Sequence, residues 1–175
     1  MSPEELDAWR VFSRGSTLVQ DQLNQDMERE AGLSVNEFEV LSILAAAPNR
    51  RERMSKLADE LVHSRSRLTH TVRRLERDRF VKRVKCDDDG RGIYCLLTKS
   101  GREKYESSVA IHEQAVRERL FAKLSKAEIG QLSKIFRKVL REAEARRKAL
   151  NVSYGSDCRG ESEDCCLEGI EESSC

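Results

Sequence analysis

One stretch of the chain, residues 64–79, restricts the possible folds more than any other because it combines an apolar stripe with many arginines. Leu68, Val72 and Leu75 are spaced i, i+4 and i+7, so a helix places all three on one face. The rest of its surface carries the polar and basic side chains Arg65, Ser66, Arg67, Thr69, His70, Arg73, Arg74 and Arg77. Such a helix packs against the protein on one side and presents cations on the other.

The segments around this helix follow an informative order. A short helix is expected over residues 55–61, and a three-residue turn at 62–64 leads into the basic helix. β-prone segments at residues 80–86 and 92–98 then flank an acidic turn with an Asp-Gly signal. A short helix, a tight turn, a second helix and a β-hairpin together make a winged helix-turn-helix.

Further helices are expected on both sides of this unit. Ser34 and Glu37 form a capping box at the start of a helix that ends at Pro48, and residues 49–53 are expected to be a polar loop. The six expected helices cover residues 4–30, 34–48, 55–61, 64–79, 99–123 and 126–150. The predicted fold class is therefore mainly α, with a small β-hairpin wing.

The net charge of +1 conceals a strong asymmetry along the chain. Residues 50–85 contain 13 Lys and Arg against five Asp and Glu, whereas residues 151–175 contain one Arg against seven acidic residues. A basic concentration of this kind indicates a polyanion partner or, alternatively, a solvated helix face.

Composition also predicts the domain organisation. We expect residues 1–150 to form one domain and the tail 151–175, rich in Gly, Ser, Glu and Cys, to be disordered. No run of 18 uncharged apolar residues occurs, and the acidic N-terminus lacks the basic-then-apolar order of a secretory signal. We therefore expect no membrane span and a cytoplasmic location.

The N-terminal part of the basic helix is the part expected to contact DNA. Such a helix enters the major groove, where Arg67 or Arg73 is suited to guanine. The shorter polar side chains are suited to base edges or phosphates, namely Ser66, Thr69 and His70. Ser64, as the N-cap, leaves the amides of the first turn available to a phosphate.

Ion pairing within the protein is the alternative for part of this set. The arginines to which it applies are Arg73, Arg74 and Arg77, with Glu76, Asp78 or neighbouring helices as partners. Arg65 and Arg67 lie near the helix start, where the helix dipole disfavours a cation. An external anion explains these two better.

The ordered motifs resemble those of the MarR family of regulators. They are LVHSRSRLTHTVRRLERDRFV at residues 61–81, Asp-Gly-Arg at 89–91 and Leu-Thr-Lys-Ser-Gly-Arg at 97–102. The likeness spans residues 5–147 and includes the order of six helices with a hairpin after the fourth. It implies a transcription regulator that binds DNA.

The resemblance implies roles for the wing and the long helices. Arg91 matches the family's wing arginine, which enters the minor groove, and Asp89 matches the acid that orients it; alternatively, Asp89 only shapes the turn. Residues 1–33 and 99–150 are implied to form a dimer, leaving 34–98 as the DNA-binding lobe. Twofold symmetry then implies an inverted-repeat operator with half-sites about 34 Å apart. An apolar stripe fits such a dimer at Ile129, Leu132, Ile135, Phe136, Val139 and Leu140.

One position departs from the family pattern. Members usually have Gly where Arg79 stands, and the recognition helix ends there in a left-handed conformation. A non-glycine residue costs about 1 kcal/mol if that geometry is kept. The end of the helix is therefore expected to differ slightly.

Six cysteines stand at positions 86, 95, 158, 165, 166 and 175. Cys86 and Cys95 are expected to share one face of the hairpin, directly opposite or one diagonal apart. Arg83 and Lys85 would lower a thiol pKa there, and oxidation would distort the wing and release DNA. The alternative is two small, half-buried residues. The tail cysteines lack C-x-x-C spacing, and no metal or cofactor is expected.

Together these features predict a sequence-specific transcription regulator, a repressor, that binds double-stranded DNA as a homodimer. The signal is expected to be thiol oxidation under oxidative stress or, alternatively, a small phenolic or other apolar ligand. A helical protein-interaction module without DNA binding is the alternative from another class. An enzyme is not expected, because the chain has no Gly-rich phosphate loop, nucleophile elbow or acid pair at interpretable spacing.

Overall fold

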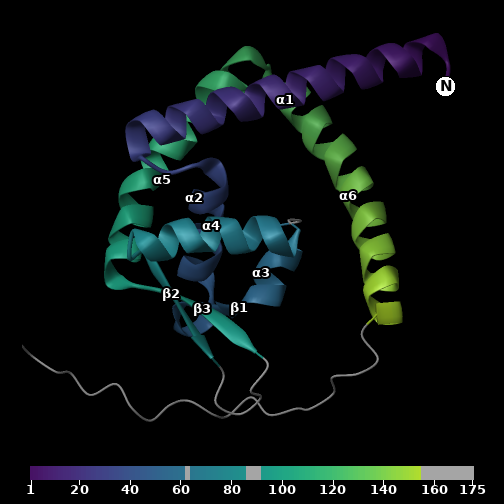
Figure 1. Ribbon diagram of the computed structural model, residues 1–175. Coiled ribbons are helices and arrows are strands. Elements are labelled where there is room, and N and C mark those ends of the chain that lie inside the picture. Colours follow the sequence, from purple (N-terminus) through teal and green to yellow (C-terminus); the bar gives the residue numbers. More distant parts are fainter. Residues whose placement is uncertain (62–63, 86–91, 155–175) are drawn as a thin grey trace, which may run out of the picture. The chain divides into compact units, whose positions relative to one another are not determined.

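The computed structural model describes residues 1–61, 64–85 and 92–154. Its elements are α1 (Pro3–Ala31), α2 (Val35–Ala46), a 3-10 turn η1 (Pro48–Arg50), β1 (Arg51–Arg53), α3 (Met54–Glu60), α4 (Arg65–Arg77), β2 (Val81–Lys85), β3 (Ile93–Leu97), α5 (Lys99–Arg119), a second 3-10 turn η2 (Phe121–Lys123) and α6 (Lys126–Tyr154) (Figure 1). The six predicted helices are confirmed. Within the described residues, none of them is long and apolar enough to span a membrane.

The junction between α1 and α2 forms as its sequence predicts. Gly32 ends α1 in the left-handed conformation, with φ of 61°, which glycine adopts at little cost. The capping box is present: Ser34 Oγ accepts from the Glu37 amide at 3.3 Å, and the Glu37 carboxylate accepts from the Ser34 amide at 2.8 Å. The start of α2 is thereby fixed by its own first turn.

The wing is built on a three-stranded sheet, not on the predicted hairpin alone. The strands are antiparallel in the order β1-β3-β2, because residues 51–53, predicted to be a polar loop, pair with residues 94–96 of β3. The sequence Arg-Glu-Arg contains no β-branched or aromatic side chain and so gives no local strand signal. Pairing with β3 decides the conformation of this segment.

The basic helix α4 and the sheet share one hydrophobic core. Leu68, Val72 and Leu75, predicted to hold this helix to the protein, are 1%, 0% and 0% exposed. They pack with buried side chains of α2, α3 and the strands, including Leu41, Leu44, Leu57, Val81, Cys95 and Leu97. Burial of such a side chain stabilises the fold by about 1.5–3 kcal/mol, so α4 is anchored along most of its length.

The end of α4 keeps the left-handed geometry although it lacks glycine. The Phe80 amide donates to the Leu75 carbonyl at 2.9 Å and the Arg79 amide to the Glu76 carbonyl at 3.1 Å, which is a Schellman termination. Arg79 has φ of 61°, at a cost of about 1 kcal/mol. The expectation that the helix end differs from the family geometry is therefore wrong, because neighbouring contacts hold it.

Those contacts come from the start of α5. Thr98 Oγ1 lies 2.8 Å from the Arg79 carbonyl and 3.0 Å from the Phe80 carbonyl, and it accepts from the Gly101 amide at 3.0 Å. Ser100 Oγ donates to the Arg79 carbonyl at 3.0 Å. A Cβ on Gly101 would lie 1.9 Å from the Phe80 oxygen, so only glycine permits this approach. We call these five residues the α4–α5 clasp.

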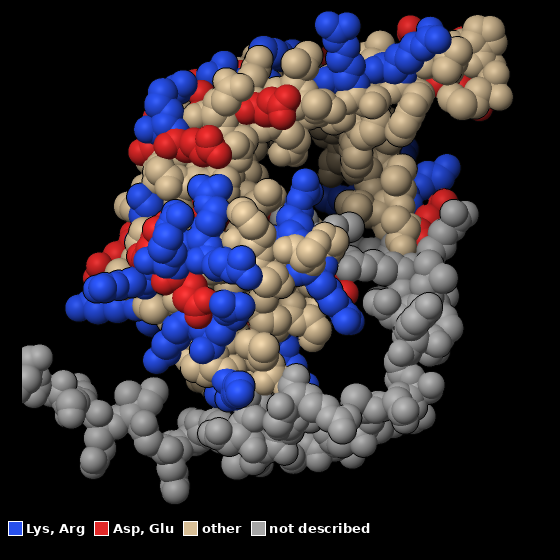
Figure 2. Space-filling view, in the orientation of Figure 1, with Lys and Arg blue, Asp and Glu red and all other residues tan. Residues whose placement is uncertain are grey.

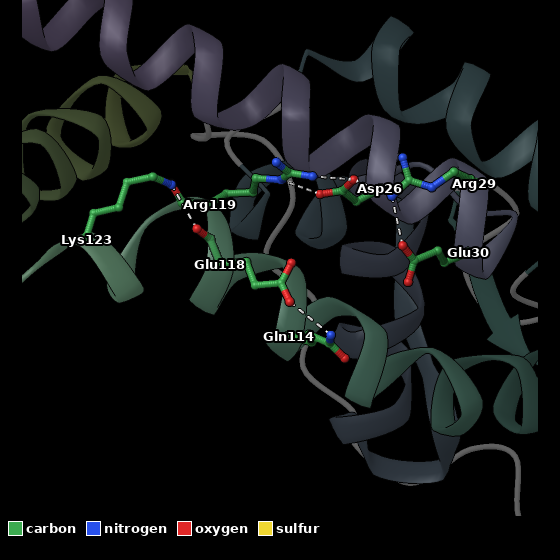
Figure 3. A network of polar contacts seen from close by, with 7 residues as sticks. All are labelled: Asp26, Arg29, Glu30, Gln114, Glu118, Arg119 and Lys123. Atoms are coloured by element: carbon green, nitrogen blue, oxygen red, sulfur yellow. Dashed lines mark hydrogen bonds and ion pairs between the residues drawn. The ribbon is translucent and has the colours of Figure 1, made fainter.

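A buried carboxylate ties α1 to α5. Asp26 is 4% exposed and accepts from Arg119 Nε at 2.6 Å and Nη2 at 2.9 Å, with Arg29 adding a bond at 2.7 Å (Figure 3). Its hydrogen bonds from Arg119 hold the pKa of the Asp26 carboxyl below its usual value. The last turn of α5 is thus fixed to the C-terminal part of α1.

The described chain forms two compact units, residues 1–125 and a second unit that begins at Lys126 and contains α6. The apolar stripe predicted on α6 is largely exposed, with Ile135 at 59%, Val139 at 55% and Leu140 at 52%. The helix continues to Tyr154, beyond its predicted end at residue 150.

Replacing Gly101 with alanine is expected to weaken the α4–α5 clasp. The new Cβ would meet a backbone oxygen, which cannot move aside as a flexible side chain can, so the free energy of unfolding should fall by about 3 kcal/mol. Gly15→Ala is the matched control: a Cβ at Gly15 of α1 has nothing within 4 Å. Alanine there should raise the free energy of unfolding by about 0.5–1 kcal/mol. Urea unfolding measures both, and a Gly101→Ala protein as stable as the wild type would contradict the clasp.

The Asp26–Arg119 pair makes stability depend on pH in a defined direction. Asp26→Asn should melt below the wild type at neutral pH, because the guanidinium group of Arg119 then faces a neutral amide. Since the folded pKa of Asp26 is lowered, its contribution is complete above the unfolded value of about 3.9 and disappears as the pH falls through the folded value. Thermal melts of both proteins between about pH 7 and pH 2 measure this. A difference that stays constant over that range would rule out an ionised Asp26 as its cause.

Candidate nucleic-acid interface

The N-terminus of α4 carries the positive end of the helix dipole. Ser64 Oγ accepts a hydrogen bond from the Arg67 amide at 3.3 Å, as predicted for the N-cap. From Arg65 to Leu75 the helix contains no acidic residue. The helix dipole and the adjoining amides therefore favour an anion at this end.

Most of the predicted DNA-contacting side chains lie on the open face of α4. Among those on the helix, the exposed ones are Arg65, Ser66, Arg67, His70, Arg73 and Arg74. Thr69 is half-buried, and its hydroxyl donates to the Arg65 carbonyl at 2.8 Å. Within the described part of the chain, Arg65, Arg67 and Arg73 form no ion pair. These three guanidinium groups remain available to an outside anion.

Two other arginines of α4 are engaged within the protein. Arg74 Nε lies 3.0 Å from Glu37 Oε1, and the Glu37 side chain is only 3% exposed. Arg77 Nε lies 3.2 Å from Asp78 Oδ1. Because a buried carboxylate needs a cation beside it, the contact with Glu37 favours the intramolecular alternative for Arg74.

Glu76, one of the partners considered for the α4 arginines in the ion-pair alternative, binds the sheet instead. Its Oε2 accepts from Arg83 Nη2 at 2.6 Å and from Arg83 Nε at 3.0 Å. These bonds lower the pKa of the Glu76 carboxyl and link α4 to β2. The base of the wing is thereby held against the basic helix.

A polar hollow of about 520 Å³ lies beside the open face of α4. Side chains of α1, α2 and α4 line it, among them Asn24, Glu28, Asn36, Arg67, His70 and Arg74. A molecule in this hollow would touch four of the predicted DNA-contacting residues, namely Ser66, Arg67, His70 and Arg74.

The tip of the wing lies outside the described residues, and with it Asp89, Arg91 and Cys86. The four tail cysteines lie outside them as well. Among the described residues, no group of three or more His, Cys, Asp or Glu is placed to hold a metal ion.

Cys95 is buried in the core, which changes the prediction made for it. It is 0% exposed and pairs with Arg83 across the sheet, so its diagonal neighbours are Val81 and Lys85. The predicted opposite or diagonal placement relative to Cys86 is therefore wrong. Burial raises the pKa of the Cys95 thiol to about 12, an effect larger than the attraction of Arg83. The expected lowering of the thiol pKa is also wrong at this position.

Positive charge gathers on the face that α4 occupies. Figure 2 shows Lys and Arg crowded over the region of α4 and the strands in Figure 1, with fewer Asp and Glu among them. Sequence reasoning found the arginines of α4 but missed that Arg51 and Arg53 belong to the sheet, because β1 has no local strand signal.

Comparison with known proteins places this geometry in a family. Residues 22–107 match the family described as transcriptional regulator SarA/Rot. The chain is 28% identical over 133 residues to the uncharacterized HTH-type transcriptional regulator YkoM of Bacillus subtilis (strain 168), a match covering 76% of this chain and 84% of YkoM.

Solved structures extend the likeness over nearly the whole of two relatives. Sco3205, a MarR family transcriptional regulator from Streptomyces coelicolor crystallised in complex with DNA, is 35% identical, with a TM-score of 0.76 over 82% of this chain and 93% of Sco3205. AbsC, a MarR family transcriptional regulator from the same organism, is 30% identical, with a TM-score of 0.75 over 83% of this chain and 97% of AbsC. With the same fold and this level of identity, the chain belongs to the MarR family of transcriptional regulators.

Proposed function

We propose that this regulator binds an inverted-repeat DNA operator as a homodimer and represses transcription there. The observation that carries the proposal is the division of α4 into an apolar stripe, exposed by 1% or less, and an open face with Arg65, Arg67 and Arg73. Guanidinium groups without an acidic partner suit phosphates and base edges. The crystallised complex of Sco3205 with DNA supports this use of the fold.

We propose a DNA contact for each side chain of the open face of α4. Arg67 and Arg73 contact guanine in the major groove, and Arg65 binds a phosphate. The shorter polar residues contact base edges or phosphates, namely Ser66, Thr69 and His70. Ser64, by capping the helix, orients the first-turn amides toward a phosphate. Arg74 is assigned to Glu37 and no longer to DNA.

The role that we propose for the wing in DNA binding follows from the family resemblance. Arg91 enters the minor groove beside α4, and Asp89 orients its guanidinium. The bond between Arg83 and Glu76 supports this arrangement because it holds the base of the wing to the helix that enters the major groove.

A second copy of the chain is the proposed cover for two exposed apolar faces. On α1, Trp9 is 57% and Phe12 45% exposed, and on α6 Ile135 is 59% and Val139 55% exposed. Exposed apolar faces of this kind mark interaction sites. We assign dimerisation to residues 1–33 and 99–150, DNA binding to 34–98, and neither to the acidic tail 151–175.

The proposed response to oxidants rests on Cys86. Cys95 is unsuited to it, because its buried thiol has a pKa raised to about 12 and the thiolate is the reactive form. Release by an apolar ligand is supported less, since the hollow beside Arg67 has a polar and charged lining.

Selection of bound fragments from the organism's own genomic DNA, with and without peroxide, tests this function. The enriched fragments should share an inverted repeat whose half-site centres lie about 34 Å apart. Peroxide should release them from the wild type and not from Cys86→Ser. Failure to enrich any common sequence would contradict operator binding, while equal release from both proteins would remove only the redox response.

Substitutions on α4 test the assigned contacts. Arg67→Ala and Arg73→Ala should each weaken binding of the selected fragment by about 1–3 kcal/mol. Arg77→Ala is the matched control, because it removes the same charge from the same helix but from a guanidinium paired with Asp78. Fluorescence anisotropy titrations measure the affinities. An equally large effect of Arg77→Ala would show that overall charge, and not these contacts, determines binding.

A charge on the exposed stripe of α6 tests the dimer. Val139→Asp should convert the dimer to a monomer, because burying an unpaired carboxylate costs several kcal/mol. Arg137→Asp, two residues away and so on a different side of α6, should remain dimeric. Sedimentation velocity distinguishes the two states, and a dimeric Val139→Asp protein would exclude this face as the interface.

A further inference from the structure

The register of the strands divides the side chains of the sheet between two faces. Cys95 pairs with Glu52 and Arg83, and it shares the inner face with the buried Val81 and Leu97. The opposite face, called the outer face, carries Arg51, Arg53, Lys82, Val84, Tyr94 and Leu96. These six positions hold three cations and no acidic residue. Glu52, the acid of β1, lies on the inner face, and its carboxylate is 2.6 Å from Lys56.

Tyr94 organises two of these cations. The guanidinium carbons of Arg51 and Arg53 lie 5.2 Å and 5.5 Å from the centroid of its ring. Arg53 Nε also donates to Tyr94 Oη at 3.1 Å. Contact with one ring restricts both side chains while their charge is kept. The conformational entropy cost is then smaller when these guanidinium groups bind an anion.

The backbone before β1 adopts a rare conformation that leads to this arrangement. Asn49 and Arg50 are both left-handed, each with φ of 52°. Asparagine tolerates this region, whereas arginine seldom adopts it. These two left-handed residues turn the chain from the end of α2 into β1. Backbone strain of this kind is retained where the surrounding structure or a function requires it.

The outer face lies across the sheet from α4, because Arg83 of the inner face binds Glu76 of that helix at 2.6 Å. Because α4 and the outer face lie on opposite sides of the sheet, a duplex bound to α4 would reach the outer face only through DNA that flanks the operator. We propose that Arg51, Arg53 and Lys82 bind phosphates of the duplex DNA that flanks the operator. Planar guanidinium groups fit phosphate oxygens, and such contacts lengthen the footprint without reading bases. The inference rests on the proposed DNA-binding function.

Binding to the selected operator in two lengths tests the proposal. One fragment is trimmed to the half-sites, about 20 base pairs, and the other keeps flanks to about 40 base pairs. Arg51→Gln/Arg53→Gln should lower affinity for the long fragment about tenfold and reduce the slope of log K against log salt by about 0.9 for each phosphate that the variant no longer binds. Affinity for the trimmed fragment should not change, and the nuclease footprint should shorten at both ends.

Two further variants keep the test decisive. Arg102→Gln/Arg117→Gln removes the same charge from exposed positions of α5; once sedimentation velocity has shown that this variant is as dimeric as the wild type, it should leave both affinities unchanged. Lys82→Gln changes the outer face on β2, where Lys82 pairs with Leu96, and should weaken only the long fragment. If the double variant of β1 does not melt cooperatively, and so is not folded, Lys82→Gln takes its place in the test.

The possible results of these binding measurements distinguish contact with flanking DNA from contact inside the operator and from no contact with DNA. An equal decrease in affinity for the trimmed and long fragments would overturn the assignment to flanking DNA, because the arginines would then act inside the operator. Unchanged affinity in folded outer-face variants would overturn the proposal and leave this face to another partner, such as a protein. Failure of the proposed function is distinct, since the wild type would then bind neither fragment.

Discussion

The hydroxyl of Thr98 lies 2.8 Å and 3.0 Å from the carbonyls of Arg79 and Phe80, and the position of α4, the helix proposed to bind DNA, depends on this contact. Three elements meet there: the end of α4, the start of β2 and the first turn of α5. Gly101 allows them to approach because a side chain would collide with the Phe80 oxygen. A helix that contacts base edges has to be held to a fraction of an ångström, and this clasp fixes one of its ends.

The remainder of α4 is held by different forces. Leu68, Val72 and Leu75 bury the inner stripe, and Glu37 draws Arg74 toward α2. A buried carboxylate is costly without a cation, so Glu37 determines which arginine of the helix forms an ion pair with α2. The arginines left on the open face are those with no acidic group of the described chain within reach. Packing and electrostatics thus select which arginines lie on the surface that we propose binds DNA.

Local signals were sufficient for the helices and several of their ends. The capping box at Ser34 and the spacing of the apolar residues in α4 act within one or two turns, so sequence alone reveals them. They were insufficient for β1, whose extended conformation comes from pairing with β3. They also failed at Cys95, because the exposure and pKa of a thiol depend on strand register and on what covers the sheet. At Arg79 the clasp overrides the preference of the residue itself.

The sequence by itself determined that residues 65–77 form a helix with one apolar and one basic face, because helical periodicity is a property of neighbouring residues. It also carried the motifs of the family. Only the tertiary structure decided which arginines are paired and which are open, since the partner of Arg74 comes from another helix. It likewise decided that Arg51 and Arg53 gather around Tyr94, because the register of two strands joins segments far apart in the chain.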